Sequence, residues 1–96
     1  MKVRYTRQAR RDLEDIYTYL EKRASVSAQS VKNLIEQRIG ALSDFPLMAP
    51  ETDERGTYEL MIVRYPYGVY YEVNRGEVWI LHIRNTRRKK WKRRKQ

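Results

Sequence analysis

The stretch RYPYGVYYEVNRGEVWILHIR, residues 64–84, places two runs rich in tyrosine, valine and isoleucine on either side of Asn74-Arg75-Gly76. β-Branched and aromatic residues favour strands, and a short Asn- and Gly-containing segment between two such runs is typical of a tight hairpin. The stretch therefore predicts strands over residues 69–73 and 77–84, joined as a hairpin.

Working outward from this hairpin, residues 58–64 alternate in the same way and predict another strand. The Tyr65-Pro66-Tyr67-Gly68 sequence predicts the turn that joins it to the hairpin, and residues 46–56, rich in turn formers, predict a surface loop. Three consecutive strands with short connections form an antiparallel meander. At the other end of the chain, the alternating residues 2–5 predict a short strand.

Two amphipathic helices are predicted between residue 5 and the loop. Thr6 is a good N-cap for a helix over residues 7–23, and Ser25 or Ser27 can cap a second helix that ends before Phe45-Pro46. The first apolar stripe comprises Ala9, Leu13, Ile16, Tyr17, Leu20 and Ala24, and the second comprises Ala28, Val31, Leu34, Ile35, Ile39 and Leu42. Because the connection is short, the helices must form an antiparallel hairpin.

These elements predict an α+β fold of order β-α-α-β-β-β, in which the helical hairpin packs on one face of a small antiparallel-meander sheet. Residues 1–86 form the predicted single domain and residues 87–96 a basic C-terminal tail. The chain has a net charge of +9, yet residues 1–86 carry 13 basic against 12 acidic side chains, so the tail holds nearly all of it. Such a tail indicates an acidic partner.

Composition excludes several protein classes. The chain has no cysteine, which excludes a disulfide scaffold and thiolate metal sites and suits a reducing cytosol. Neither a signal peptide nor an apolar run of the ~20 residues needed to span a bilayer is recognisable. We therefore expect a cytoplasmic protein without a membrane contact.

Few residues could carry chemistry. His82 is the single histidine, no carboxylate stands at helical spacing beside it, and no glycine-rich phosphate loop is present, so we expect no metal and no cofactor. His82 is expected on the same strand face as Ile80 and Arg84. It is either a hydrogen-bonded structural histidine or a general acid or base beside Arg64 and Arg84, a set that could cleave RNA without a metal.

Eight tyrosines are present, five of them between Tyr58 and Tyr71. Most are expected to be half-buried strand residues, whereas Tyr65, Tyr67 and Tyr70 are expected to be exposed because they flank the turn or oppose the face of Val69. In the tail, Trp91 is expected to pack on the domain or on a partner, and Arg87 and Arg88 could pair with nucleic acid.

Five motifs follow one another along the chain: YTRQARRDLEDIYTYL, LSDFPLMAP, RYPYGVYYEV, EVWILHIR and RRKKW, the last containing Arg87, Arg88 and Trp91. Together they resemble the RelE/ParE superfamily of bacterial toxins, and within it the ParE, plasmid-stabilisation branch. The resemblance covers nearly the whole chain and implies the same β-α-α-β-β-β order. It also implies a type II toxin neutralised by a cognate antitoxin.

Members of the ParE branch are understood to inhibit DNA gyrase, whereas their RelE-like relatives cleave messenger RNA on the ribosome. Where RNase members have a phosphate-binding arginine this chain has Gly68, and Asn85 stands where many members have a histidine. Asparagine cannot exchange a proton near neutral pH. Both departures favour a non-enzymatic gyrase inhibitor over a metal-free, ribosome-dependent mRNA interferase, for which His82, Arg64, Arg84 and Arg87 are the candidate residues.

The gyrase hypothesis makes Arg84, Arg87, Arg88 and Trp91 the candidate contacts to gyrase or to the DNA bound to it. A nucleic-acid-binding module without toxicity is a third alternative. For the antitoxin, expected to be ParD-like, we expect a segment rich in acidic and apolar residues that forms a hetero-oligomer with the toxin by adding a strand or a helix. The candidate contacts to it are Tyr65, Tyr67, Tyr70 and Trp91.

Overall fold

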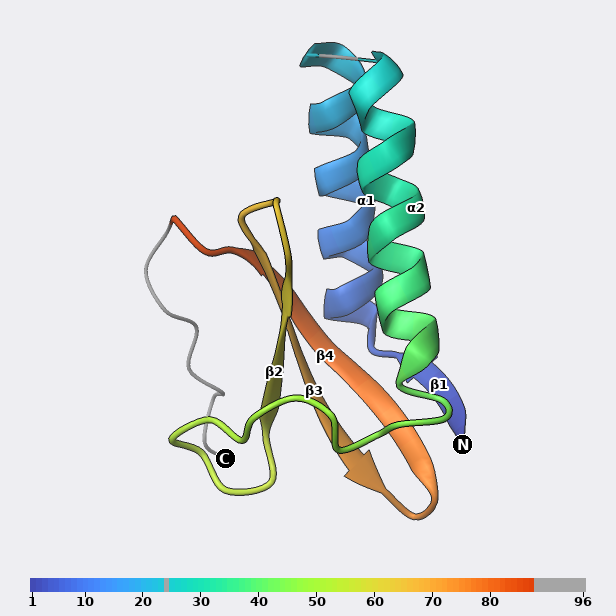
Figure 1. The fold of residues 1–96 in the computed structure, drawn as a ribbon, viewed down its shortest axis with the longest axis vertical. Coiled ribbons are helices and arrows are strands. Elements are labelled where there is room, and N and C mark those ends of the chain that lie inside the picture. Colours follow the sequence, from blue (N-terminus) through green and yellow to red (C-terminus); the bar gives the residue numbers. More distant parts are fainter. Residues whose placement is uncertain (24, 88–96) are drawn as a thin grey trace.

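The computed structural model describes residues 1–23 and 25–87. Its elements are β1 (Lys2–Tyr5), α1 (Arg7–Arg23), α2 (Ser25–Ala41), β2 (Tyr58–Ile62), β3 (Tyr67–Asn74) and β4 (Glu77–Asn85) (Figure 1). The order β-α-α-β-β-β is therefore confirmed, and β1 and α1 have the predicted bounds. Residue 24 and the tail from Arg88, with Trp91, lie outside the described residues.

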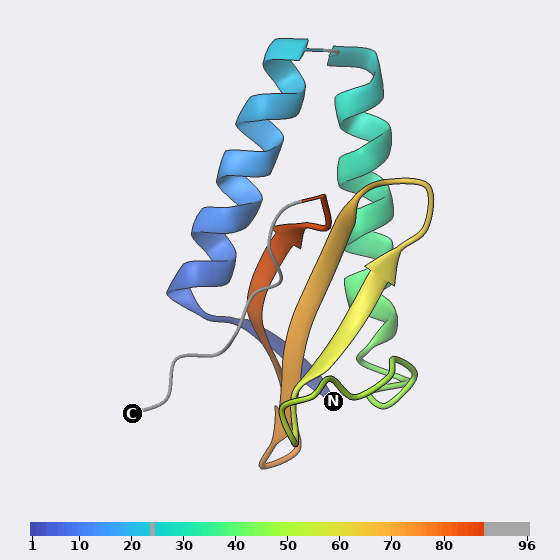
Figure 2. The same ribbon diagram turned by 90° about the vertical axis from the view of Figure 1, so that its left-hand side faces the viewer.

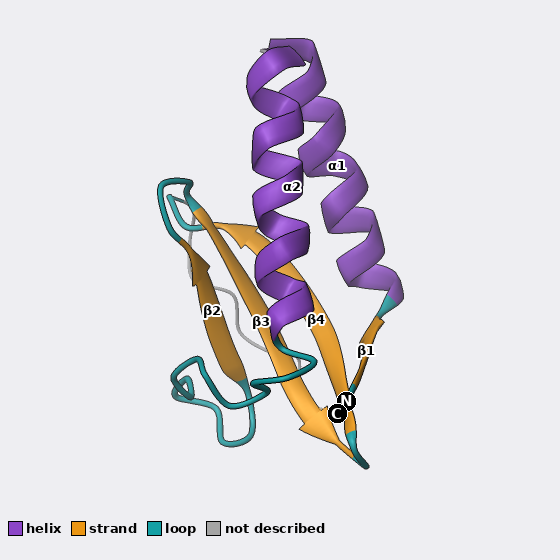
Figure 3. Ribbon diagram, turned by 45° about the vertical axis from the view of Figure 1, so that its right-hand side comes forward, coloured by secondary structure: helices purple, strands orange, loops and turns teal. Residues whose placement is uncertain are grey.

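The sheet has the strand order β1-β4-β3-β2, and its last three strands form the predicted antiparallel meander. β1 pairs in parallel with β4, with Val3 opposite Val78, so the whole sheet is mixed (Figure 3). After β1 ends, the amide of Thr6 donates to the carbonyl of Ile80 at 3.0 Å and carries the pairing one step further. The chain then enters α1 directly beside β4.

The two helices lie side by side and antiparallel on one face of the sheet and extend past its end (Figures 1 and 2). Thr6 caps α1, because its Oγ1 accepts from the amide of Ala9 at 3.1 Å. The members of both predicted apolar stripes that the structure describes pack between the helices and against the sheet. The buried core comprises Ala9, Val31, Ile35, Ile39, Leu42, Ala49, Leu60, Ile62, Tyr67, Val69, Tyr71, Val78, Ile80 and Ile83.

The connection between β2 and β3 differs from the prediction. The turn comprises residues 63–66 rather than 65–68, so β2 ends at Ile62 and β3 begins at Tyr67. The amide of Tyr65 donates to the carbonyl of Ile62 at 3.3 Å, and Arg64 has a positive φ of 81°. The shift by two residues places Tyr67 inside the sheet, on the same face as Val69 and Tyr71, where it contacts the helices' core.

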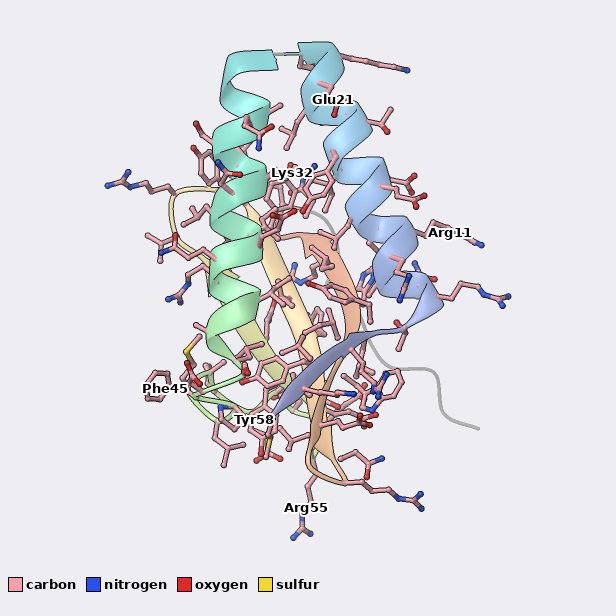
Figure 4. All side chains as sticks on the ribbon, turned by 90° about the vertical axis from the view of Figure 1, so that its right-hand side faces the viewer. Arg11, Glu21, Lys32, Phe45, Arg55 and Tyr58 are labelled. Carbon is pink, nitrogen blue, oxygen red and sulfur yellow. The ribbon has the colours of Figure 1, made fainter. Side chains whose placement is uncertain are left out.

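The outer edge of β2 is partly covered by the preceding loop. The amide of Glu59 donates to the carbonyl of Pro50 at 3.1 Å, and Glu51 forms a bridge with Tyr58. Beyond Glu59, no strand among residues 1–23 and 25–87 neighbours this edge. Exposed apolar side chains lie on β2, on the turn after it and on the loop, where Phe45 projects away from the fold (Figure 4); they include Phe45, Leu47, Met48, Met61 and Val63.

Candidate functional site

The face of the sheet that points away from the helices, here called the outer face, gathers the polar residues. By register, Gly68 lies opposite Arg84, Tyr70 opposite His82, and Glu59 of β2 opposite Tyr70. These residues come from three adjacent strands and form one continuous cluster. The predicted candidates His82 and Arg84 are therefore brought together.

A bulge in β4 decides which residues share this face. Tyr70 pairs with His82 and Tyr71 with Ile80, so Leu81 is the extra residue. A strand alternates sides at every residue, and one extra residue reverses the alternation. The expectation that His82 lies on the face of Ile80 is therefore wrong: Ile80 is fully buried under the helices, whereas His82 and Arg84 lie on the outer face.

Arg84 forms an ion pair with Glu59, its Nε lying 3.1 Å from Glu59 Oε2, and both side chains are only 13% exposed. Gly68 makes this geometry possible. A Cβ built on Gly68 would lie 2.2 Å from that same Oε2, a distance that no side chain tolerates. The Glu59 carboxylate thus occupies the space that a side chain at position 68 would fill.

His82 forms a second polar pair with Asp12 of α1. Its Nδ1 lies 2.6 Å from Asp12 Oδ2, which also accepts a hydrogen bond from the amide of Ile83 at 3.0 Å. Burial alone would raise the pKa of Asp12, but hydrogen bonds with His82, the Ile83 amide and Gln8 outweigh it and hold this pKa below its usual value. Asp12 therefore fastens the start of α1 to β4.

Tyr70 lies between these two pairs. Its ring stacks on His82 with centroids 6.1 Å apart, and the Arg84 guanidinium lies 5.7 Å from the ring centre. Burial raises the pKa of the Tyr70 hydroxyl, and the Glu59 carboxylate raises it further, whereas Arg84 opposes the change. This tyrosine therefore stays protonated near neutral pH.

The cluster can do limited chemistry as it stands. Its arginine and its histidine each contact a carboxylate of the chain itself, so a phosphate that approached them would meet the negative charges of Glu59 and Asp12. Neither carboxylate was among the predicted site residues. Asp12 is 70 residues from His82 and Glu59 is 25 residues from Arg84, so no local spacing indicates either pairing.

The expected exposure of two tyrosines is wrong. Tyr67 is 5% exposed and packs in the core, and Tyr70 is 1% exposed within the outer-face cluster. Tyr65 is partly buried and packs against the edge of the core. Of the predicted antitoxin contacts, Tyr65 alone keeps an accessible surface among the described residues, and Trp91 lies beyond them.

The residues predicted to contact the target also differ in their exposure and their partners. Arg84 is held by Glu59, whereas Arg87 is exposed, and its amide donates to the Asn85 side chain at 2.9 Å. Arg64 is exposed on the turn after β2 and forms no ion pair within residues 1–23 and 25–87. Arg88 and Trp91 fall outside the described part of the chain.

In the described part of the chain, no group of three or more His, Cys, Asp and Glu side chains is placed to hold a metal ion. None of the helices there is both long and apolar enough to cross a bilayer.

Comparison with known proteins gives a consistent result. The chain is similar to a solved chain of the chromosomal ParDE toxin–antitoxin system from P. aeruginosa, with a TM-score of 0.77 and 24% sequence identity. The match covers 88% of this chain and 95% of the solved chain. A chain of the RelBE2 toxin–antitoxin complex from Mycobacterium tuberculosis has the same coverage, a TM-score of 0.58 and 27% identity. No curated protein sequence gave a significant match. Residues 3–90 match the family model described as the ParE toxin of the type II toxin–antitoxin system parDE. The chain therefore belongs to the ParE toxin family of type II toxin–antitoxin systems.

Proposed function

We propose that this chain is a toxin that inhibits DNA gyrase by binding, without catalysis, and that a cognate antitoxin neutralises it. The observation that carries the proposal is the ion pair between Arg84 and Glu59 in the space above Gly68. RNA cleavage needs cationic groups free to stabilise the charge that develops on the phosphate. An arginine already neutralised by the chain's own carboxylate is poorly suited to that task.

The test is a supercoiling assay and a DNA-cleavage assay with purified gyrase and purified chain. Inhibition of supercoiling at the concentrations that arrest growth supports the proposal. Unchanged supercoiling at those concentrations rejects it. Glu59→Gln is an informative variant, because a non-enzymatic inhibitor does not need Arg84 to be released and its activity should change little as long as the chain folds.

A metal-free, ribosome-dependent mRNA interferase is the second candidate. It is favoured by the way the fold brings Tyr70, His82 and Arg84 into one cluster. On this alternative, substrate phosphate must replace Glu59 on Arg84. Mapping of 5′ ends after induction distinguishes the two: new ends inside coding regions support the interferase, and intact transcripts during growth arrest exclude it.

The antitoxin partner is proposed from the family and from the free edge of β2. Because the amide of Glu59 points outward to Pro50, alternation makes the amide of Met61 point outward too, and no strand in the described part of the chain covers it. Met61 and Val63 are 46% and 68% exposed and can pack on apolar side chains of an added segment. An acidic and apolar antitoxin segment that adds a strand here fits both features.

If the antitoxin adds a strand at the edge of β2, its binding should depend on the outward amide of Met61. Met61→Pro removes the outward amide and should weaken antitoxin binding, whereas Met61→Ala keeps the amide and should weaken it much less. Binding can be measured by calorimetry with the purified antitoxin. Equal affinities for both variants would place the antitoxin elsewhere on the toxin.

A further inference from the structure

The end of the sheet opposite the β3–β4 hairpin has an unusual construction. Tyr67 pairs with Asn85, and the amide of Thr86 donates to the carbonyl of Pro66 at 2.6 Å. The turn over residues 63–66 therefore lies next to Thr86, just after the end of β4. We call residues 63–66 together with Thr86 and Arg87 the basic end.

Arg64 stands where glycine would be favoured. It is the third residue of the turn closed between Ile62 and Tyr65, and its φ of 81° lies in the left-handed region. Turns with this conformation at the third position prefer glycine, because a Cβ is strained there. The chain itself uses glycine at two other positions with nearly the same φ, Gly56 at 83° and Gly76 at 76°. The backbone conformation does not explain why this position has an arginine, so the reason must lie in the arginine side chain.

The charge at the basic end is uncompensated. Arg64 and Arg87 are both exposed, and neither takes part in an ion pair within the described residues. The sequence has no Asp or Glu over residues 60–71 or 78–96, and seven more Lys and Arg follow Arg87 up to residue 95. Arg84 nearby is neutralised by Glu59 and adds nothing to this field.

The opposite end of the sheet provides an internal contrast. There Arg75 also has a positive φ, of 51°, and is also exposed. It lines a shallow pocket together with Glu72 and Glu77, so carboxylates accompany its charge. The two arginines share backbone strain and exposure and differ in their electrostatic surroundings.

We propose that the basic end contacts the phosphate backbone of duplex DNA through Arg64 and Arg87. Duplex DNA carries one negative charge per about 1.7 Å of its axis, which suits an exposed segment that carries two arginines and no carboxylate of its own. The planar guanidinium group pairs with phosphate oxygens by two parallel hydrogen bonds, and Arg64 is exposed on its left-handed turn. The inference rests on the proposed function in one respect: DNA held by gyrase is the duplex that the toxin meets.

The test compares two variants of the full chain, Arg64→Gly and Arg75→Gly. Each removes one positive charge and each relieves one positive φ, so both should unfold at the same temperature as the wild type or higher. Binding to a fluorescein-labelled duplex of about 20 base pairs is measured by anisotropy at several salt concentrations. Arg64→Gly should weaken binding about 3- to 10-fold at low salt and lower the salt slope by about 1, whereas Arg75→Gly should leave both nearly unchanged. Arg87→Gln should behave like Arg64→Gly.

Three results would overturn the inference. One is no salt-dependent binding of the duplex by the wild-type chain. Another is an equal loss in Arg64→Gly and Arg75→Gly, which would show that net charge alone is responsible. The third is equally tight, Arg64-dependent binding of polyglutamate, which would assign the basic end to an acidic protein instead. Supercoiling inhibition measured on the same preparations separates this inference from the proposed function: inhibition without binding of free DNA rejects the inference alone, and DNA binding without inhibition rejects gyrase as the target.

Discussion

The two faces of the sheet are stabilised in different ways. On the helix side, apolar side chains such as Ile80 and Val69 are fully buried against the hairpin. On the outer face, Tyr70 is nearly as buried, but its neighbours are two polar pairs, Arg84 with Glu59 and His82 with Asp12. A hydrophobic contact depends mainly on the area removed from water, whereas a buried polar pair depends on both partners being present in the right geometry. The outer face is therefore the more sensitive to small changes of geometry.

The largest effect is expected on the helix side. Ile80→Ala leaves a cavity among fully buried side chains and should reduce the free energy of unfolding by about 2–5 kcal/mol. Urea denaturation followed by circular dichroism measures it. Met61→Ala, at a residue that is 46% exposed on the outer face, is the control and should change stability by less than about 0.5 kcal/mol.

The next largest loss of stability is expected for Gly68→Ala, a substitution on the outer face. The new Cβ would lie 2.2 Å from Glu59 Oε2, so the carboxylate must move away from Arg84. We expect a loss of about 1–3 kcal/mol, measured in the same way. In a Glu59→Ala background the space is empty, and Gly68→Ala should then cost much less. The same cost in both backgrounds would show that the Glu59 carboxylate is not the reason for glycine at position 68.

Asp12→Asn tests the second polar pair through the pH dependence of the protein's stability. The folded protein holds the pKa of Asp12 below its ordinary value of 3.8, so its ionised form stabilises the fold above that pH, and the contribution is lost as the pH falls through the lowered pKa. Asp12→Asn should cost about 1–2 kcal/mol near neutral pH and flatten the acid limb of the stability profile. Urea midpoints between pH 2 and pH 7 provide the measurement. A wild-type profile and a variant profile that run parallel would rule out this contribution of Asp12.

The smallest effect concerns Thr6, which links the start of α1 to β4. Its Oγ1 accepts from the amide of Ala9 and donates to the carbonyl of Leu81 at the bulge, each at 3.1 Å. Thr6→Ala removes both bonds and should cost about 1 kcal/mol, whereas Thr6→Ser keeps the hydroxyl and should cost less. Thermal unfolding of the two variants measures the difference. If Thr6→Ser destabilised as much as Thr6→Ala, the methyl group rather than the hydroxyl would be responsible.

Periodicity predicted the helices and strands because it reports directly on which residues are removed from water. The stripes of Ala9 and Ile35 and the alternation around Val69 were sufficient for the order of elements and for the packing of the hairpin on the sheet. The prediction was wrong at the turn before β3, where the chain turns two residues earlier than the Pro-Tyr-Gly pattern indicates. Arg64 in a left-handed conformation is responsible, and arginine is not a residue from which a pattern predicts that conformation.

The candidate site was predictable only in part. His82 and Arg84 could be assigned to one face because they are two residues apart on one strand. The bulge at Leu81 decided that this face points away from the helices, and nothing in the composition of β4 indicates where an extra residue lies. The tyrosines show the same limitation. Alternation along one strand predicts that Tyr70 is exposed, because it takes no account of side chains from neighbouring strands, whereas Tyr70 is buried.

The sequence by itself determined the element order, the apolar core, the concentration of positive charge in the C-terminal segment and the family. These properties depend on the types of residues and their spacing along the chain, which are local quantities. The tertiary structure alone decided that Glu59 neutralises Arg84 above Gly68, that Asp12 binds His82, and that the turn carrying Arg64 lies next to Thr86 at the end of the sheet. The physical reason is that ion pairs and hydrogen bonds act over a few ångströms in space, and strand register and the bulge determine which distant residues come that close.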